Sequence, residues 1–449
     1  MRGLRSTIVL ALVLIGLFAY IYFVTWKKHA DDSSSKQDKV FPSVQADKIE
    51  ALVVKSASGA TTTLKKENGS WQIVQPISAR ADEPEISGIT SALTSINVVR
   101  VIDESPADLK DYGLTEPRID VGFKASGDKD YRHLLIGEKS PTGADLFAQR
   151  GGEKRVFLIP SFQESTFNHS TFELRDKTLL KFERDKVDGI EVNAGGKSLH
   201  VAKDGTEWKL IKPLQVRADY GSVEGLVGRL QSAQMKSIVT ENPSAADLKK
   251  YGFDKPEATV NLSLGSARAT LLVGSKAEDN TVYARDASNP AVMTIESALV
   301  DELKKGADDY RRKDIFEFRA YNANRLEITR GGQTVVFEKV KGQGTNAVDK
   351  WRRVSPAAGD VDKDKMDSLL SRLANMRAAS FVGSSAKTGL ESPAMTVFLK
   401  FEDGKKEERA SFGKADADVY VSRPGEGDAA KIDATDFNEA VKTLDEISK

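Results

Sequence analysis

The sequence predicts an α+β protein, in which an N-terminal transmembrane helix precedes three tandem homologous modules of mainly antiparallel strands with two main helices each. A segment that begins with tryptophan and ends with proline occurs three times, starting at Trp71, Trp208 and Trp351. The tryptophans are 208 − 71 = 137 and 351 − 208 = 143 residues apart. Solenoid repeats span only about 20–50 residues, so each copy is expected to be a whole domain.

The transmembrane helix is predicted from residues 6–26, which include no charged residue. As a helix these residues reach roughly 30 Å, the hydrocarbon thickness of a bilayer. The segment ends with Tyr20, Tyr22 and Trp26, and such aromatic side chains are enriched at membrane interfaces. A cleaved signal peptide is the alternative, although its apolar region is usually shorter. We therefore expect residues 1–26 to form a cytoplasmic N-terminus and a single-pass anchor, with the C-terminal body outside the cytoplasm.

The rest of the chain divides into a tether and three modules. Residues 27–43 are polar, rich in serine and without periodicity, which predicts a flexible tether. The modules are expected at residues 44–182, 183–318 and 319–449, the third being divergent. The 66 basic and 66 acidic residues balance, so no overall positive field favours nucleic acid as a partner.

An amphipathic helix is predicted after each tryptophan segment, because apolar residues recur there at i, i+3, i+7 and i+10. The residues of this stripe are Ile86, Ile89, Leu93 and Ile96, then Val223, Leu226, Leu230 and Ala233, then Met366, Leu369, Leu373 and Met376. Asp82, Asp219 and Asp362 each lie six residues after the repeated proline and are expected to cap these helices. Glu85 would complete a capping box in the first copy.

A short helix followed by glycine, an apolar residue and proline comes next, and this order is a helix stop signal. The positions that mark the repeat are Trp71, Trp208 and Trp351, Gly113, Gly252 and Gly389, and Pro117, Pro256 and Pro393. Tyr112 and Tyr251 could contact a ligand, but a packed elbow is the favoured interpretation. Alternating apolar residues downstream predict a meander of strands, one of them centred on Phe147, Tyr283 or Tyr420.

Residues 174–182 match residues 310–318 at an offset of 136, and each segment lies at the end of one expected module, directly before the next. This location predicts a joint between modules. The residues expected to make contacts there are Arg175, Asp176, Lys177, Arg311, Arg312 and Lys313. The arginines could bind an anionic ligand, but pairing with carboxylates across the joint is the favoured interpretation.

The sequence offers no set of catalytic or metal-binding residues. It contains no cysteine, and its four histidines are dispersed. Asp360, Asp362 and Asp364 alternate like the start of a calcium loop, but Lys365 and Ser371 stand where that loop needs glycine and glutamate. We therefore expect no cofactor, no metal and no enzymatic activity. A hydrolase with two carboxylates brought together by the fold is the remaining enzymatic alternative.

Taken together, the anchor, the tryptophan strand, the capped helix, the D-L-K-x-Y-G segment at 108–113 and 247–252, and the joint resemble a bacterial membrane-anchored family. That family is catalogued as domain of unknown function 4340. The resemblance implies a protein of the inner membrane with a periplasmic body, often encoded beside gliding-motility-type ABC transporter components. It implies no catalytic residues.

Two functions follow as hypotheses. The first is a non-catalytic, membrane-anchored scaffold or accessory protein with partners in an ABC-type transporter or envelope complex. The alternative is a module that binds an envelope glycan or peptide through three weak sites, because linked sites raise apparent affinity. Exposed repeated aromatic side chains would support the alternative, and the candidates are Tyr112, Tyr251, Phe147, Tyr283 and Tyr420.

Overall fold

A computed structural model of the protein describes residues 38–342, 349–383 and 385–448. The apolar segment 6–26 and most of the tether lie outside these residues. No helix among the described residues is long and apolar enough to cross a membrane. The transmembrane anchor therefore stays a prediction.

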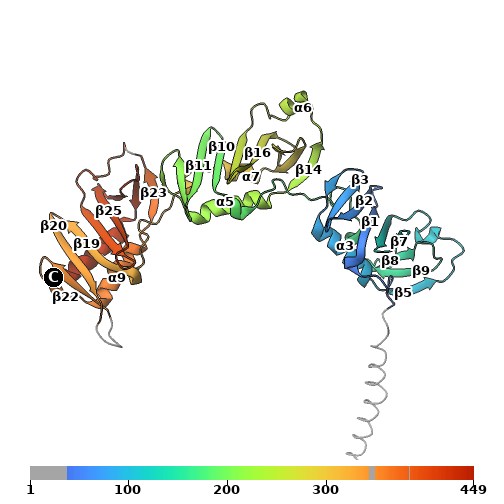
Figure 1. The fold of residues 1–449 in the computed structure, drawn as a ribbon, viewed down its shortest axis with the longest axis horizontal. Coiled ribbons are helices and arrows are strands. Elements are labelled where there is room, and N and C mark those ends of the chain that lie inside the picture. The colour runs from blue at the N-terminus through green and yellow to red at the C-terminus, as the bar shows by residue number, and fades with distance from the viewer. Residues whose placement is uncertain (1–37, 343–348, 384, 449) are drawn as a thin grey trace, which may run out of the picture. The chain divides into compact units, whose positions relative to one another are not determined.

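Each module is built on a nine-stranded antiparallel sheet, and all three sheets have the same strand order (Figure 1). The first has the order β4-β3-β2-β1-β6-β7-β8-β9-β5. Its strands are β1 (Ile49–Lys55), β2 (Thr61–Glu67), β3 (Ser70–Gln75), β4 (Ala79–Arg80), β5 (Arg100–Asp103), β6 (Ile119–Ala125), β7 (Arg132–Lys139), β8 (Asp145–Arg150) and β9 (Val156–Pro160).

The second and third sheets repeat this topology, which confirms three tandem modules. The second contains β10 (Gly189–Ala194), β11 (Lys197–Asp204), β12 (Glu207–Lys212), β13 (Val216–Arg217), β14 (Met235–Thr240), β15 (Ala258–Leu264), β16 (Ala267–Lys276), β17 (Thr281–Asp286) and β18 (Val292–Glu296). The third contains β19 (Ala323–Arg330), β20 (Gln333–Val340), β21 (Lys350–Ser355), β22 (Gly359–Asp360), β23 (Ala378–Val382), β24 (Met395–Phe401), β25 (Lys406–Ala415), β26 (Asp418–Ser422) and β27 (Ala429–Ile432).

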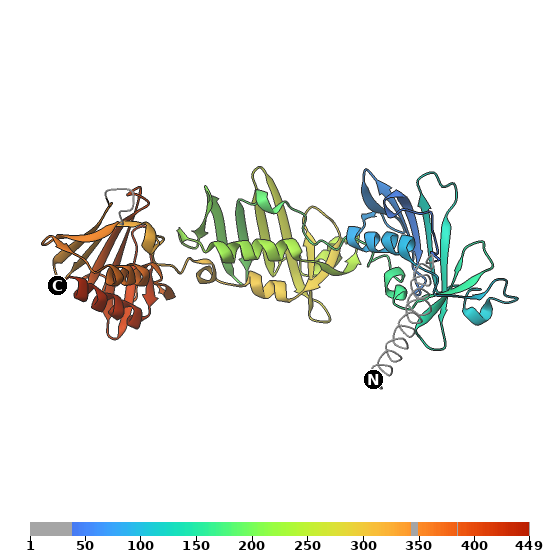
Figure 2. The ribbon, with the colours of Figure 1, turned by 90° about the horizontal axis from the view of Figure 1, so that it is seen from below.

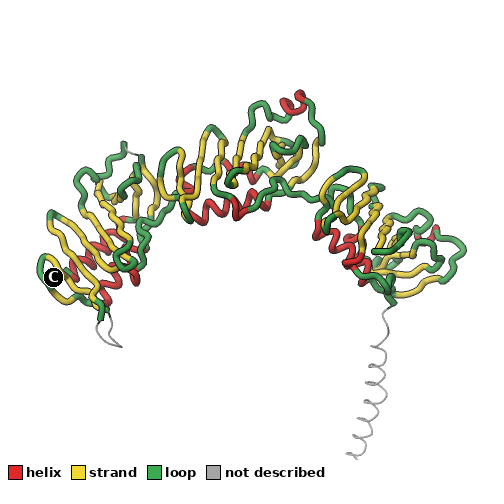
Figure 3. Tube along the Cα trace, viewed as in Figure 1, coloured by secondary structure: helices red, strands yellow, loops and turns green. Residues whose placement is uncertain are grey.

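The described residues are mostly β, so the expectation of two main helices in every module is wrong for the first two (Figure 3). Their one long helix is α3 (Glu83–Ser95) or α5 (Tyr220–Ser232). Their other helices are short: α4 (Gln163–Phe167), α6 (Ala245–Lys250), α7 (Ala298–Leu303) and α8 (Ala307–Tyr310). Only the third module has two long helices, α9 (Lys363–Ala374) and α10 (Ala434–Ile447). In α10 the buried residues recur with helical spacing at Phe437, Ala440, Leu444 and Ile447.

The long helix lies across one face of its sheet, as Figure 2 shows for α5. The apolar stripe predicted from the sequence is buried there except for the half-buried Ala233, and Ile86, Ile89 and Leu93 are fully covered in the first module. The tryptophans on β3, β12 and β21 are 6%, 2% and 7% exposed, so they are buried as well. In all three copies the peptide bond before the repeated proline, at Pro76, Pro213 and Pro356, is cis.

All three predicted aspartate caps are confirmed. Asp82, Asp219 and Asp362 accept the amide N–H three residues on, at 3.4, 2.8 and 3.0 Å. The capping box expected at Glu85 is wrong, because the Asp82 N–H donates to the carbonyl of Leu174 instead, at 2.9 Å. The Glu85 carboxylate lies 3.7 Å from His169.

A pair of glycines explains the repeated elbow. Gly113, Gly252 and Gly389 adopt φ of +67°, +83° and +69°, the left-handed conformation that favours glycine. A second glycine on the facing strand, Gly274 in the second module, lies so close that a Cβ atom would overlap the carbonyl oxygen of Tyr251. The same overlap would occur at the equivalent glycines of the other modules, Gly137 and Gly413. The elbow therefore requires glycine on both sides of the contact.

We expect Gly274→Ala to destabilise the second module by about 1–3 kcal/mol, because the new methyl group meets backbone that cannot move away. Gly225→Ala is the matched control, since Gly225 lies within α5 and a Cβ atom there would meet nothing within 4 Å beyond its own helix backbone. Alanine is the better helix former, so the control should be neutral or more stable. Urea unfolding of the two variants measures the difference. Equal stability of both variants would contradict the close contact.

Candidate functional site: the joints beside the long helices

The chain divides into two compact units, of which one ends at Lys177 and the other begins at Thr178. The boundary lies within residues 174–182, the first joint predicted from the sequence. The second joint, residues 310–318, lies inside the second unit. Each joint is an extended segment held by backbone pairing.

The beginning of each joint pairs with the residue that precedes the long helix of its own module. Arg175 forms a β-bridge with Ala81, and Arg311 forms one with Ala218. The helix caps take part as well, because the Asp82 N–H donates to Leu174 and the Asp219 N–H donates to Tyr310, at 2.9 and 2.7 Å. The free N–H groups at each helix start are thereby partly satisfied by the departing chain.

The end of each joint pairs with the residue that follows a long helix. Thr178 forms a β-bridge with Gln234, just after α5, and Asp314 forms one with Arg377, just after α9. In the second joint the Ile315 N–H also donates to Met376, and the Ala378 N–H donates to Lys313, at 3.0 and 2.7 Å. Residues 311–314 therefore connect the start of α5 to the end of α9.

The side chain of Arg311 is buried at the second joint, with only 2% of its surface exposed. Its Nη1 atom donates to Asp428 at 3.0 Å, and Asp308 lies 3.5 Å from the same nitrogen. The guanidinium carbon lies 3.6 Å from the centre of the Phe381 ring, a cation–π contact. Arg311 comes from the end of the second module, whereas Phe381 and Asp428 belong to the third.

A second arginine, Arg217 on β13, also reaches carboxylates of the joint and the third module. It contacts Glu426 at 2.7 Å and Glu317 at 3.2 Å, and it donates to the carbonyl of Asp314 at 3.2 Å. Burial alone would lower the pKa of Arg217, but Glu426 and Glu317 outweigh it and raise this pKa above its ordinary value. The folded joint therefore favours the charged guanidinium.

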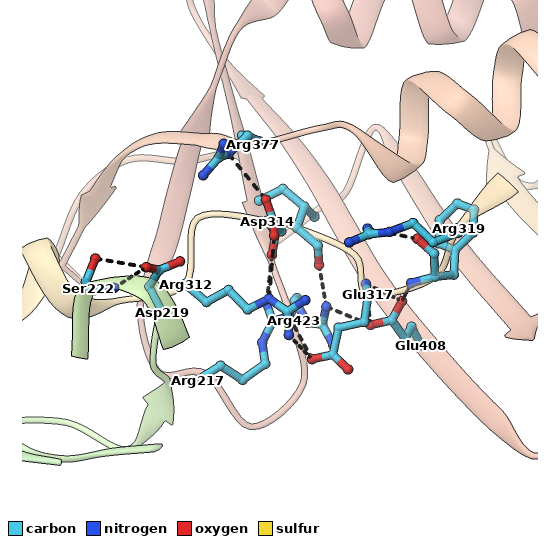
Figure 4. A network of polar contacts seen from close by, with 12 residues as sticks. Arg217, Asp219, Ser222, Arg312, Asp314, Glu317, Arg319, Arg377, Glu408 and Arg423 are labelled. Atoms are coloured by element: carbon cyan, nitrogen blue, oxygen red, sulfur yellow. Dashed lines mark hydrogen bonds and ion pairs between the residues drawn. The ribbon is translucent and has the colours of Figure 1, made fainter. Parts of the chain in front are cut away.

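Glu317 and Glu408 complete this polar network (Figure 4). The buried Glu408 carboxylate accepts the Glu317 N–H at 2.9 Å and lies 3.0 Å from Arg423. Burial alone would raise the pKa of Glu317, but Arg312, Arg217 and Arg423 outweigh it and hold this pKa below its ordinary value. Acidic and basic side chains thus alternate along this network, which lies within the second unit.

The sequence-predicted residues do not all take the same role. Arg312 pairs with Glu317 at 3.1 Å, whereas Lys313 contributes its carbonyl to Ala378. At the first joint the Asp176 N–H donates to the carbonyl of Arg80 at 2.9 Å. Lys177 pairs with the cap Asp82 at 3.1 Å.

Sequence reasoning missed the partners of the second joint, namely Arg217, Phe381, Glu408, Arg423, Glu426 and Asp428. One signal was available, since the loop after β26 reads Arg-Pro-Gly-Glu-Gly-Asp at 423–428. The equivalent loop after β17 reads Ala-Ser-Asn-Pro-Ala at 287–291 and has no charge. The space among the side chains of the second joint is only about 10 Å³. A cavity of that size holds no more than about one water molecule, so the arginines act as packing partners there.

The repeated aromatic residues largely pack against one another. Tyr112 and Phe147 lie 5.1 Å apart between ring centres, and Tyr251 and Tyr283 lie 4.5 Å apart. Tyr251 is only 9% exposed. Tyr420 donates to Asp418 at 3.3 Å. The two aromatic pairs stabilise the elbows of the first and second modules. Within the described residues, no group of three or more histidine or acidic side chains is placed to hold a metal ion.

Three copies of one sheet topology, joined by docked extended segments, define a tandem-repeat protein of mainly β modules. The chain belongs to the family described as a domain of unknown function, DUF4340, whose model matches residues 71–210, 208–388 and 351–449. No curated protein matches the chain.

Two similar solved structures are DNA polymerase sliding clamps from Pseudomonas aeruginosa, one with a ligand and one bound to griselimycin. They are 9% and 10% identical to this chain and cover 88% of it, over 93% and 94% of their own lengths. Both TM-scores are 0.16, so this likeness carries no argument about fold or function.

We expect Asp428→Asn to destabilise the second joint by roughly 2 kcal/mol, because it weakens a charge-assisted bond to a buried guanidinium. The double variant Arg311→Met/Asp428→Asn should recover part of this loss, since no buried charge then lacks its partner. Asp445→Asn is the control, because its pair with Arg330 is exposed and should contribute less than about 1 kcal/mol. Hydrogen exchange of residues 311–316 measures the effect. If the double variant lost as much stability as the two single variants together, Arg311 and Asp428 would not be coupled.

Glu317 should make the second joint sensitive to acid. A carboxyl group whose folded pKa lies below its unfolded value stabilises the fold above the unfolded pKa, and this stability is lost as pH falls through the folded pKa. The ordinary value is 4.5. Glu317→Gln should therefore be less stable than the native protein at pH 7, and the deficit should shrink below about pH 4.5. Thermal unfolding from pH 7 to pH 3 measures this, with the exposed Glu407→Gln as control. A deficit that does not change with pH would contradict it.

Proposed function

We propose that this protein is a non-catalytic scaffold or accessory protein, anchored in the inner membrane by residues 6–26, with its modules in the periplasm and its partners in an ABC-type transporter or envelope complex. The observation that carries the proposal is the construction of the joints. Each joint segment is paired by backbone at the start of one long helix and at the end of another. The residues that recur in sequence at the joints thus serve to connect modules.

The second joint supports this proposal further. Arg311 is fully buried among groups of two modules, and Arg217, Glu317 and Glu426 form a second set of pairs there. A residue used for chemistry needs access to substrate, whereas these side chains enclose a space of about 10 Å³. Such packing is suited to holding two modules at a defined spacing, which is what a scaffold with more than one binding surface needs.

The glycan-binding alternative depends on exposed repeated aromatic residues. Tyr112 contacts Phe147 edge to face and Tyr251 contacts Tyr283, so these rings are engaged with one another; Tyr251 is buried, and the other three are half-buried. This packing favours the scaffold over the glycan-binding function.

Affinity purification of the full chain from its native membranes after mild cross-linking tests the proposal. We expect permease or ATPase subunits of a transporter to be recovered with the full chain. A variant without residues 1–37 is the control, and it should be released from the membrane fraction with a weaker yield of these partners. Recovery of the full chain alone, or equal recovery in soluble form, would argue against the proposal.

A further inference from the structure

The buried side chain of Arg311 at the second joint has more hydrogen-bond donors than the chain supplies with acceptors. Its Nη1 atom donates to Asp428 at 3.0 Å. Its Nε and Nη2 atoms are buried as well, and no atom of the described residues accepts a hydrogen bond from either. A buried donor without a partner costs free energy, because it gives up its bonds to water and gains none in return. These two N–H groups therefore require an acceptor that is not part of the described chain.

The space of about 10 Å³ at this joint adjoins the Arg311 guanidinium, and a row of side chains on three neighbouring strands lines one side of it. Ala430 on β27 is the middle residue of the row and pairs with Phe381 on β23 and with Val421 on β26. The guanidinium carbon lies 3.6 Å from the centre of the Phe381 ring. Because alanine is short, the middle of the row leaves room beside the guanidinium.

The equivalent rows of the other two modules have a large residue in the middle. Phe157 takes this place in the first module and Met293 in the second, and each pairs with both neighbouring strands as Ala430 does. Phe157 and Met293 are 1% and 3% exposed, so their side chains fill the interior there. Alanine at position 430 is thus specific to the module that receives a buried arginine.

The size and polarity of the space identify what it fits. A volume of about 10 Å³ is the least that accommodates one water molecule, and a buried water typically makes about three hydrogen bonds. Arg311 offers two donors, Nε and Nη2. The carboxylates of Glu426 and Asp428 also line the space and can accept from a water.

Charge distinguishes a water from a small anion such as chloride, which could accept the same two N–H bonds. Asp428 and Asp308 lie 3.0 and 3.5 Å from Arg311 Nη1, so the charge of this guanidinium already has carboxylates close by. The other cations that line the space are each paired with a carboxylate as well, namely Arg217, Arg312 and Arg423. A neutral ligand adds no unbalanced charge to this buried site.

We propose that the second joint binds one ordered water molecule, which accepts hydrogen bonds from Arg311 Nε and Nη2 and donates to the carboxylates of Glu426 and Asp428. The water connects the end of the second module to the acidic loop of the third. This inference goes beyond the scaffold function, because it depends neither on the membrane anchor nor on a transporter.

Two substitutions of the same shape test the site in the full chain. Ala430→Val fills the space and leaves the two N–H groups without an acceptor, whereas Ala430→Thr brings a hydroxyl group that can accept in place of the water. We expect the amides of residues 311–316 to exchange hydrogen at least about fivefold faster in the valine variant than in the threonine variant.

The opposite order is expected for a dry space, because valine gains buried apolar surface there and threonine buries a hydroxyl group. Circular dichroism of both variants checks that they fold. Exchange in the threonine variant that is as fast as in the valine variant, or faster, would overturn the proposal.

A crystal structure of the full chain in detergent, with a second crystal soaked in bromide, locates the ligand directly. We expect one peak of electron density about 2.7–3.2 Å from both Nε and Nη2 of Arg311, without anomalous signal from bromide. The absence of density at this position, or bromide bound there, would overturn the proposal.

Discussion

The pairing of extended backbone with the two ends of a helix is the interaction on which the rest of this structure depends. A helix start presents unpaired N–H groups, and a two-residue edge strand presents one unpaired side. In the first two modules both are satisfied by the chain that leaves the module, through Asp82 and Asp219. Since the pairing uses backbone atoms, it can form even though the side chains of the two joint segments differ. The two joint sequences differ at many positions and bind in one way.

Electrostatics then distinguishes the second joint. A guanidinium taken out of water is costly unless carboxylates and aromatic faces replace its hydration. Arg217 has Glu426 and Glu317 for this purpose. Arg311 has Asp428 at its Nη1 atom and the Phe381 ring, while its buried Nε and Nη2 atoms have no hydrogen-bond partner among the described residues. The loop that supplies Glu426 and Asp428 carries two acidic residues in the third module, one (Glu153) in the first and none in the second. The sequence of this one loop therefore distinguishes the ion pairs of the second joint from the corresponding parts of the other modules.

Much of each module could be predicted from sequence because it follows from local periodicity. The stripe of Ile86, Ile89 and Leu93 and the aspartate before it are sufficient to locate a capped helix. Two-residue edge strands such as β4 have no periodicity, so they could not be predicted from the sequence. Partners such as Phe381 and Asp428 lie 70 and 117 residues from Arg311 (381 − 311 = 70; 428 − 311 = 117), and only the fold brings them together.

The matched family segments begin at the three tryptophans, and this starting point matters for how the chain can be divided into fragments. Trp71 lies on β3, whereas β1 and β2 precede it and occupy the interior of the same sheet between β3 and β6. A fragment cut at residues 71–210 would lack two interior strands and carry three from its neighbour. The boundaries of the matched family segments are thus displaced from the boundaries of the folded modules by about a third of a sheet. Excision between β9 and β10 would keep each sheet whole.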